Sequence, residues 1–286
     1  MPIRLACPDF TFPLLKHGDS LKLISMMGFE AADIGLFEDR SHLYPSREFK
    51  NIPVNAGELK KKLEYAGLKL ADVFLQNALD FTSVAINHPD AGVRAESRES
   101  FMKLIEYTLV AGGHHVCILP GVLFPDIEDR QTSFERSARE LEWRICEAKK
   151  NNVAFSVEAH IGSLIENPET ALELLMAVPD LRLALDFSHF ARQGIADEQV
   201  YPLLPYANHV HFRGAKPGVL QTVVKESSVN FKEIIHRLMN LRYDGYIVLE
   251  YTWTEWENCN RTDNLSETIL LKNLIEDTLK AGNDAR

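Results

Sequence analysis

The chain has 286 residues, of which 45% are hydrophobic and 25% charged, and this is ordinary for a folded protein with a sizeable core. It carries 31 Lys and Arg against 41 Asp and Glu, which gives a formal net charge of −10. This acidic balance argues against a nucleic-acid partner, because binding to phosphates requires clustered basic side chains, so we expect a small-molecule ligand instead.

The N-terminal segment, residues 1–8, lacks the basic and apolar regions of a signal peptide. No apolar run approaches the roughly 20 residues that a membrane-spanning helix needs. We therefore expect a cytoplasmic protein with no membrane partner. The cysteines stand far apart, without a Cys-x-x-Cys pair, and are expected to be reduced. They are Cys7, Cys117, Cys146 and Cys259.

Short β-branched or apolar runs alternate along the chain with longer segments of helical period, which is typical of repeated βα units. The eight predicted strands cover residues 3–7, 31–36, 69–75, 115–119, 153–158, 182–186, 209–212 and 246–250. The predicted helices cover residues 19–27, 56–66, 91–111, 133–150, 168–178, 197–204, 231–241 and 265–281. Gly67 and Gly112 stand where helices should end, and Asn167-Pro168 where one should begin.

Eight strands, each followed by a helix and with no linker between them, predict an α/β fold of the (β/α)8 TIM barrel type. We expect residues 1–286 to form one domain, with the helix at 265–281 as its C-terminal element. A doubly wound open sheet is the rival fold, but no Gly-x-Gly-x-x-Gly follows a strand. The long segments 37–53, 76–89 and 213–230 are predicted to be loops on the active face of the barrel.

Four of the late strands end in a residue that can bind a metal: Glu158, Asp186, His211 and Glu250. Their separations correspond to successive βα units, and the carboxyl ends of barrel strands meet at one mouth, so these side chains should converge. Three converging carboxylates repel one another unless a cation lies between them. Carboxylates with one imidazole suit a divalent ion such as Mn²⁺ or Mg²⁺, whereas zinc prefers sites rich in thiolates.

The sequence around these residues resembles the sugar phosphate isomerase/epimerase superfamily. The resemblance rests on Val-Glu-Ala-His at 157–160, Leu-Asp-Phe-Ser-His at 185–189, His-Val-His at 209–211 and Leu-Glu at 249–250. Members of that superfamily, including ketose 3-epimerases, hydroxypyruvate isomerase and inosose dehydratase, are xylose-isomerase-like TIM barrels. Their Glu, Asp, His, Glu metal site occurs in the same order here. The resemblance covers strands five to eight well and the first half of the chain only through its βα rhythm.

The resemblance implies that Glu158, Asp186, His211 and Glu250 hold one divalent ion, with Mn²⁺ favoured and Mg²⁺, Co²⁺ or Zn²⁺ as alternatives. It also implies that Glu158 and Glu250 exchange protons with the substrate carbon. His209, two residues before His211 on the same side of the strand, would then lie in a second layer or in the core.

Three further residues are candidate substrate contacts. His189 matches the superfamily position that bonds to a substrate oxygen. His160 and Arg213 each follow a metal-ligand candidate by two residues and should share its facing. An arginine there could hold a hydroxyl, carboxylate or phosphate of the substrate.

The chain departs from the ketose 3-epimerases at two positions. Pro217 stands where they carry an arginine, and Leu164 where they carry a third glutamate. Lys216 and Lys225 are candidates for the missing positive charge.

Three functions therefore stay open. The first is a metal-dependent sugar isomerase or epimerase that acts through an enediolate on a ketose or related keto-sugar. The second is a lyase or dehydratase of the inosose dehydratase or 3-keto-glycoside eliminase type, and the third is a non-catalytic sugar-binding barrel. A homodimer or homotetramer is a possible assembly.

For several other residues the sequence allows two interpretations. The ends of strands one to three carry polar residues that could line the pocket or cap local turns: Asp9, Asp33, Gln76 and Asn77. Trp253 and Trp256 could stack on a sugar ring or pack between a loop and the last helix. His115 is expected to be structural.

Overall fold

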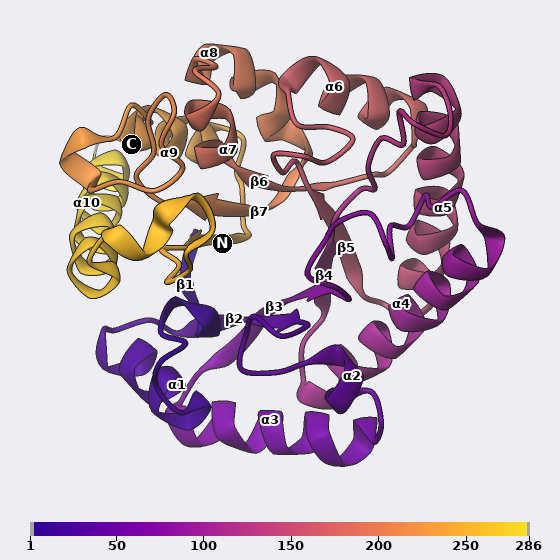
Figure 1. Cartoon of the computed structure of the whole chain (residues 1–286). Helices are drawn as coiled ribbons and strands as arrows, with labels where there is room; N and C mark the ends of the chain where they lie inside the picture. Colours follow the sequence, from indigo (N-terminus) through magenta and orange to yellow (C-terminus); the bar gives the residue numbers. More distant parts are fainter. Residues whose placement is uncertain (1–2, 285–286) are drawn as a thin grey trace.

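Eight parallel strands close into a barrel in the computed structural model, which describes residues 3–284 (Figure 1). The strands follow the chain order around the barrel, and β1 pairs with β8 to close it. They are β1 (Arg4–Pro8), β2 (Ala31–Phe37), β3 (Lys69–Gln76), β4 (His115–Ile118), β5 (Ala154–Glu158), β6 (Leu183–Asp186), β7 (Ala207–Phe212) and β8 (Tyr246–Leu249). The predicted (β/α)8 architecture is confirmed, with every predicted strand present.

Helices surround the barrel (Figure 1). The longer ones are α1 (His17–Met26), α3 (Ile52–Ala66), α4 (Ala91–Ala111), α5 (Arg130–Lys150), α6 (Pro168–Ala177), α9 (Phe231–Asn240) and α10 (Asn264–Asp284). The shorter ones are η1 (Asp9–Thr11), α2 (Pro45–Glu48), α7 (Phe187–Arg192), α8 (Asp197–Val200), η2 (Tyr201–Tyr206), η3 (Val224–Glu226) and η4 (Trp256–Arg261).

Apolar periodicity explains how the helices pack on the barrel. In α9 the buried residues are Phe231, Ile234, Ile235 and Leu238, a spacing that places them on one face of the helix. Asn230 caps the helix by accepting the Glu233 backbone N–H at 3.2 Å. Such faces bury the outer side of the sheet in one large apolar core.

Helix ends agree with the predicted stop signals. Gly67 and Gly112 follow α3 and α4 with φ of +71° and +89°, a conformation that favours glycine. Asn167 caps α6 by accepting the Thr170 N–H at 3.0 Å, and Pro168 occupies the first turn.

Several local features differ from the sequence prediction, among them the predicted helix 197–204, which is divided into α8 and η2. Helix α7 was not predicted; it begins directly after β6 because the Asp186 carboxylate accepts the Ser188 N–H at 2.8 Å and caps it. Helix α3 begins at Ile52, four residues early, since Pro53 lies in its first turn, where its missing N–H costs nothing. The predicted loop 37–53 contains the short helix α2.

All four cysteines are free, as predicted. Within residues 3–284, no helix has the length and apolar character needed to cross a membrane.

Candidate active site

The four strand-end residues meet at the mouth of the barrel. Glu158 and Asp186 end β5 and β6, His211 lies next to the end of β7, and Glu250 directly follows β8. Asp186 pairs with His211 in the sheet register, and the Glu250 N–H donates to the Phe212 carbonyl at 2.9 Å. All four side chains are buried, and one oxygen or nitrogen of each lies within 4.8 Å of the others. The structure therefore brings the predicted group together, and we call it the mouth cluster.

The imidazole of His211 presents its two nitrogens to different surroundings. Nδ1 lies 3.1 Å from Glu158 Oε1 and 3.2 Å from Glu250 Oε2. Nε2 points the other way and lies 3.6 Å from Asp33 Oδ2. Nδ1 is therefore the nitrogen that faces the carboxylates of Glu158 and Glu250.

Arg213 lies inside the mouth cluster. Its Nη2 donates to Asp186 Oδ2 at 2.7 Å and lies 3.7 Å from Glu250 Oε2, while its Nε donates to the Ser188 hydroxyl at 2.8 Å. Although burial opposes the charge, the carboxylates of Asp186 and Glu250 raise the pKa of Arg213, so it stays cationic. Arg213 also lines the pocket, so the predicted contact with the substrate stays a prediction, and the donors described above bond to protein groups.

The carboxylates of the mouth cluster sit in unequal environments. Burial, with the charge of Glu250 adding to it, raises the pKa of Glu158 to about 7. Burial also acts on Glu250, but Arg213 and His211 outweigh it and lower its pKa to about 2. Burial raises the pKa of Asp186 despite Arg213. Two buried acids with separated pKa values are a common arrangement for proton transfer.

His160 and His189 lie beside the cluster with their rings 4.1 Å apart. His189 Nε2 is 3.4 Å from Asp186 Oδ2. His160 donates from Nδ1 to the Ile161 carbonyl at 2.6 Å, which leaves Nε2 as an acceptor in the neutral ring. Burial lowers the pKa of His160 to about 4, so the ring is neutral at pH 7.

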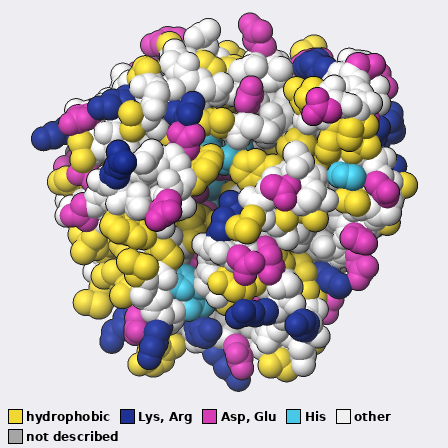
Figure 2. All heavy atoms as spheres, in the orientation of Figure 1, with side chains coloured by type: hydrophobic (Ala, Val, Ile, Leu, Met, Phe, Trp, Pro, Cys, Tyr) yellow, Lys and Arg dark blue, Asp and Glu magenta, His cyan; other side chains and the backbone are white. Residues whose placement is uncertain are grey.

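A pocket of about 390 Å³ opens above the mouth cluster. Figure 2 shows a hollow near the centre of this face, with histidine and basic side chains at its edge. Besides Glu158, Glu250, His160, His189 and Arg213, the pocket is lined by Phe10, Phe37, Arg40, Phe74, Gln76, Leu79, Asp80, Phe81, Thr252, Trp253, Thr254 and Trp256. Trp253 and Trp256 therefore border the pocket. The Trp256 ring stacks on the His160 ring, with 5.3 Å between their centroids.

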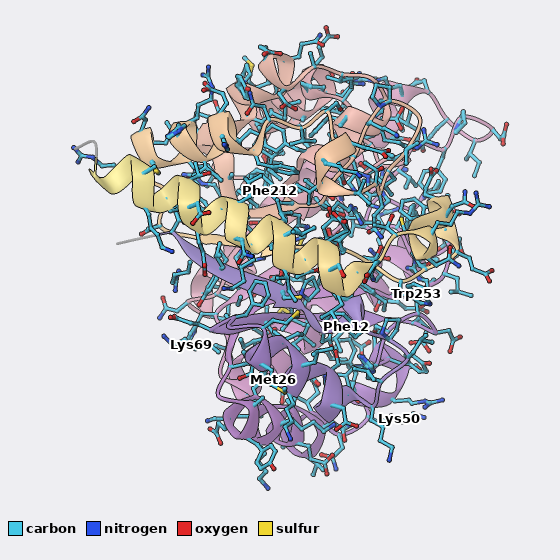
Figure 3. The ribbon with its side chains drawn as sticks, turned by 90° about the vertical axis from the view of Figure 1, so that its left-hand side faces the viewer. Phe12, Met26, Lys50, Lys69, Phe212 and Trp253 are labelled. Atoms are coloured by element: carbon cyan, nitrogen blue, oxygen red, sulfur yellow. The ribbon has the colours of Figure 1, made fainter. Side chains whose placement is uncertain are left out.

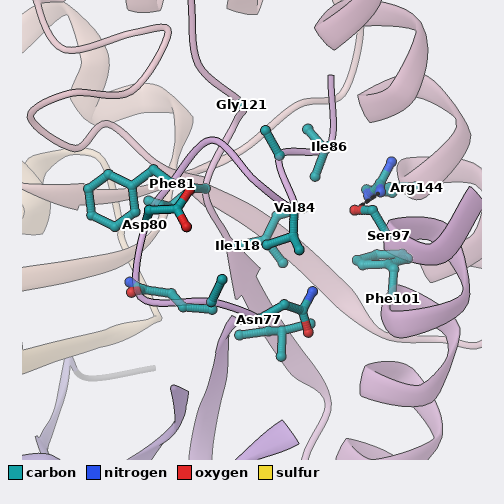
Figure 4. Close-up of a pocket in the computed structure, with 15 residues that line it drawn as sticks. Asn77, Asp80, Phe81, Val84, Ile86, Ser97, Phe101, Ile118, Gly121 and Arg144 are labelled. Atoms are coloured by element: carbon teal, nitrogen blue, oxygen red, sulfur yellow. Dashed lines mark hydrogen bonds between the residues drawn. The ribbon is translucent and has the colours of Figure 1, made fainter. Parts of the chain in front are cut away.

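Of the polar residues predicted at strand ends, Gln76 lines the pocket. Asp9 instead accepts the Gly35 N–H at 3.0 Å and pairs with His17. Asp33 lies beneath His211. Asn77 lines a separate cavity of about 50 Å³ between the β3–α4 segment and α5 (Figure 4).

The pocket's exposed cation was missed by sequence analysis. Arg40 follows β2, with its guanidinium 5.8 Å from the Phe37 ring centroid and bonded to Gln76 and to the Ala78 carbonyl. Lys216, proposed for that charge, pairs with Glu226 at 2.7 Å in the β7–α9 segment instead. Because Arg40 depends on contacts between two loops, no local pattern could have identified it.

An apolar groove of about 600 Å³ adjoins the pocket and shares Trp253 with it. It runs between the segment after η1 and the beginning of α10, where Figure 3 shows Phe12 and Trp253.

The mouth cluster fits a divalent cation by three observations. Its donors are oxygens of three carboxylates and one imidazole nitrogen, which suit Mn²⁺ or Mg²⁺. Glu250 Oε2 is buried and forms no hydrogen bond within the described part of the chain. The cluster also carries three acids against Arg213 and the imidazole of His211, and a metal would take the place of the imidazole proton among these acids.

Comparisons with known proteins agree with this fold. A family model described as xylose isomerase-like TIM barrel matches residues 21–273. The solved structure of L-ribulose 3-epimerase is 16% identical, with a TM-score of 0.77 over 99% of this chain and 96% of that one. A 3-keto-D-glucoside 4-epimerase from E. coli is 14% identical, with a TM-score of 0.70 over 96% and 99%.

A further solved structure, a probable 3-DHS dehydratase from Bacillus anthracis, is 17% identical, with a TM-score of 0.70 over 94% of this chain and 99% of that one. A search of curated proteins finds no match. The structural neighbours are thus enzymes of one fold that differ in reaction.

Proposed function

The chain belongs to the xylose isomerase-like TIM barrel family, and from this premise we propose that it is a divalent-metal-dependent sugar isomerase or epimerase. It acts through an enediolate on a ketose or related keto-sugar. The observation that carries the proposal is the mouth cluster, in which Glu158 and Glu250 approach His211 Nδ1 from different strands.

The metal would be held by Glu158, Asp186, His211 and Glu250. When bound, it would supply a positive charge that stabilises the negative charge developing on the substrate oxygens. Each of the strands β5 to β8 places one of these four donors at or next to its C-terminal end.

The two glutamates perform the proton transfers. One carboxylate removes the proton next to the substrate carbonyl, and the electrons of the broken C–H bond form the enediolate. Return of a proton to the opposite face of the same carbon inverts it, and return to the neighbouring carbon moves the carbonyl. Glu158 and Glu250 approach His211 Nδ1 from different strands, so either carboxylate can be the base and the other can return the proton.

The surrounding residues bind and orient the sugar. His160 Nε2 accepts a hydrogen bond from a substrate hydroxyl, and Trp256 provides an aromatic face beside it. Arg213 holds Asp186 in place through its Nη2. The aromatic walls of the pocket limit the access of water to the reacting carbon.

A lyase or dehydratase is the second candidate, and His160 favours it. Its ring is neutral and its hydrogen bond among the described residues is made by Nδ1, so Nε2, once protonated, could deliver a proton to a leaving oxygen on the β-carbon. The products would be an unsaturated keto-sugar and water or an alcohol. The absence of the epimerase arginine and glutamate, at Pro217 and Leu164, is consistent with such a change of outcome.

The test is incubation with ketoses and 3-keto-glycosides in D₂O with Mn²⁺. We expect deuterium at the carbon next to the carbonyl, with an epimer or isomer as product. An unsaturated product would select the lyase. Absence of exchange across the panel, with the metal bound, would contradict the enediolate chemistry. Glu140→Gln is the control variant, since Glu140 pairs with arginines between α4 and α5, away from the pocket.

A further inference from the structure

A layer of polar side chains lies inside the barrel below the mouth cluster. Ser156 and His209 stand two residues before Glu158 and His211 on the same strands, so they share the inward side. Three more residues complete this polar layer: Asp33 from β2, Asp72 from β3 and His115 from β4. Barrel interiors are usually filled by bulky apolar side chains, and buried charge is costly, so a polar layer requires an explanation.

The polar layer contains two Asp–His pairs of similar geometry. His209 Nε2 lies 2.6 Å from Asp33 Oδ2, and His115 Nδ1 lies 2.7 Å from Asp72 Oδ1. The two aspartates are register partners on neighbouring strands, and both are buried. The two histidine rings stack at 5.1 Å.

The two Asp–His pairs differ in their further contacts. His115 turns its other nitrogen to the Ser156 hydroxyl at 2.9 Å, which completes a local network. Asp33 instead extends upward, with its Oδ2 at 3.6 Å from Nε2 of His211. Asp33 is therefore the member of the polar layer that connects it to the mouth cluster.

A neutral imidazole carries one proton, and which nitrogen holds it decides which can bind a cation. For His211 to bind a metal, Nδ1 needs a free lone pair and Nε2 must carry the proton. We propose that Asp33 is a positioning residue that keeps this proton on Nε2 of His211, and that His209 holds Asp33 in place for that purpose. This inference rests on the proposed metal-dependent function and names a residue that acts through a ligand.

The charge and geometry of Asp33 suit this role. Its carboxylate lies on the side of the ring opposite Glu158, so the two acids attract different nitrogens of one imidazole. The 3.6 Å separation is longer than a hydrogen bond, and Nε2 of His211 forms none within the described residues, so Asp33 acts on the Nε2 proton through its negative charge. A carboxylate beside the second nitrogen of a metal-bound histidine commonly fixes its tautomer. His209 fixes Asp33 through the same oxygen that faces His211.

The first test is the affinity for Mn²⁺, measured by titration of the metal-free full chain. Asp33→Asn should bind about 10- to 100-fold more weakly than the unaltered protein. Asp72→Asn is the matched control, because Asp72 is equally buried and paired to a histidine but contacts His115 instead of His211. Its affinity should stay within about threefold of the unaltered protein, since its partner is not a ligand.

The second test needs no metal. Nitrogen-15 NMR of the metal-free protein, at a pH where His211 is neutral, should show the proton on Nε2, with the signal assigned by its loss in His211→Asn. In Asp33→Asn the two tautomers should mix. If Asp33→Asn does not fold, His209→Gln, which frees Asp33 from its partner, should weaken Mn²⁺ binding in the same direction but less.

Several results would overturn the inference. They are a proton on Nδ1 in the unaltered protein, equal losses of affinity in Asp33→Asn and Asp72→Asn, or no loss in either. A second equivalent of Mn²⁺ that disappears in Asp33→Asn would instead make Asp33, His209 and His211 an ion site of their own. If the unaltered protein binds no metal at all, the proposed function fails, and the NMR tautomer alone decides the role of Asp33.

Discussion

Two clusters of charged residues, each built around buried carboxylates, have opposite composition in this molecule. Between α4 and α5, one carboxylate, Glu140, is surrounded by three arginines: Arg144 at 2.9 Å, Arg98 at 2.9 Å and Arg94 at 3.7 Å. At the barrel mouth, three carboxylates share one arginine, Arg213. Figure 4 shows Arg144 of the first cluster bonded to Ser97 beside a small cavity.

The difference in charge indicates different roles: the cluster around Glu140 supports the fold, whereas the mouth cluster is arranged for a ligand. Although burial opposes it, Arg98 and Arg144 lower the pKa of Glu140, which stays ionised and fully paired. Burial raises the pKa of Glu158 to about 7, and the neighbouring charge of Glu250 adds to that rise. Substitutions in the two clusters should therefore have opposite consequences for stability and for activity.

The largest effect is expected at the mouth cluster. Glu158→Gln and Glu250→Gln should each lower kcat/KM by about 10³-fold or more, since each removes a proton-transfer group and a metal ligand. The melting temperature of the metal-free protein should stay the same or rise in Glu158→Gln, because the charge that burial disfavours is gone. It should fall in Glu250→Gln, because Arg213 and His211 stabilise the ionised form of Glu250. Steady-state kinetics and thermal unfolding check both. Near-normal turnover in either variant would refute the assignment of that glutamate.

The converse result is expected at Glu140. Glu140→Gln leaves the fully buried Arg144 without its anion and should destabilise the fold by about 3–5 kcal/mol, measured by urea unfolding. Its kcat/KM below the melting temperature should remain within about threefold of the unaltered enzyme, because no pocket residue is touched. Glu135→Gln on the same helix is the control, since its exposed pair with Arg139 is worth less than about 1 kcal/mol. If Glu140→Gln and Glu135→Gln lowered the free energy of unfolding by the same amount, the cluster around Glu140 would not have the structural role assigned to it.

Metal removal sharpens the comparison further. Saturation at a free Mn²⁺ concentration of 100 times Kd should stabilise the protein by about 2.7 kcal/mol, and a chelator should reverse this. Glu140→Gln should keep the shift and Glu250→Gln should lose it. A shift that survives in Glu250→Gln would place the ion elsewhere.

The pH dependence of metal binding should follow Glu158. Its pKa is raised from 4.5 to about 7, so a proton competes with the metal below pH 7. Mn²⁺ affinity should fall about tenfold per pH unit below 7 and level off above it. In the metal-free protein the same shift favours folding below pH 4.5 and is lost as pH rises through 7, so unfolding should be easier at pH 8 than at pH 6. An affinity that does not change between pH 6 and 8 would contradict this.

The smallest effect is expected at the rim of the pocket. Arg40→Gln should raise KM about tenfold with little change in kcat, because Arg40 lines the pocket away from the mouth cluster and would bind ground state and transition state alike. A large loss of kcat with unchanged KM would show that Arg40 takes part in the chemistry.

Sequence patterns predicted the barrel and the mouth cluster because both depend on local periodicity. Glu158, Asp186 and His211 could be placed at strand ends from alternation and spacing alone, and closure of the barrel brings strand ends together. The sequence is therefore sufficient to predict which residues stand at the C-terminal ends of β5 to β8.

The remaining features depend on contacts between distant segments. Asp33 was expected to line the pocket or cap a turn, but a register shift between β2 and β3 and the partner His209, 176 residues away, place it beneath His211. Arg40 and Phe81 occupy the pocket through loop conformations that no period encodes. Helix α7 depends on Asp186, which acts as a helix cap as well as a candidate ligand.

The most direct test of the account is the stoichiometry and affinity of Mn²⁺ in the purified protein, compared between the two clusters. We expect one equivalent in the unaltered protein and in Glu140→Gln, and binding weakened by orders of magnitude in Asp186→Asn and Glu250→Gln. A protein that takes up no divalent ion, or an Asp186→Asn variant that binds as tightly as the unaltered chain, would contradict the central claim that the excess of carboxylates at the barrel mouth exists to hold a metal.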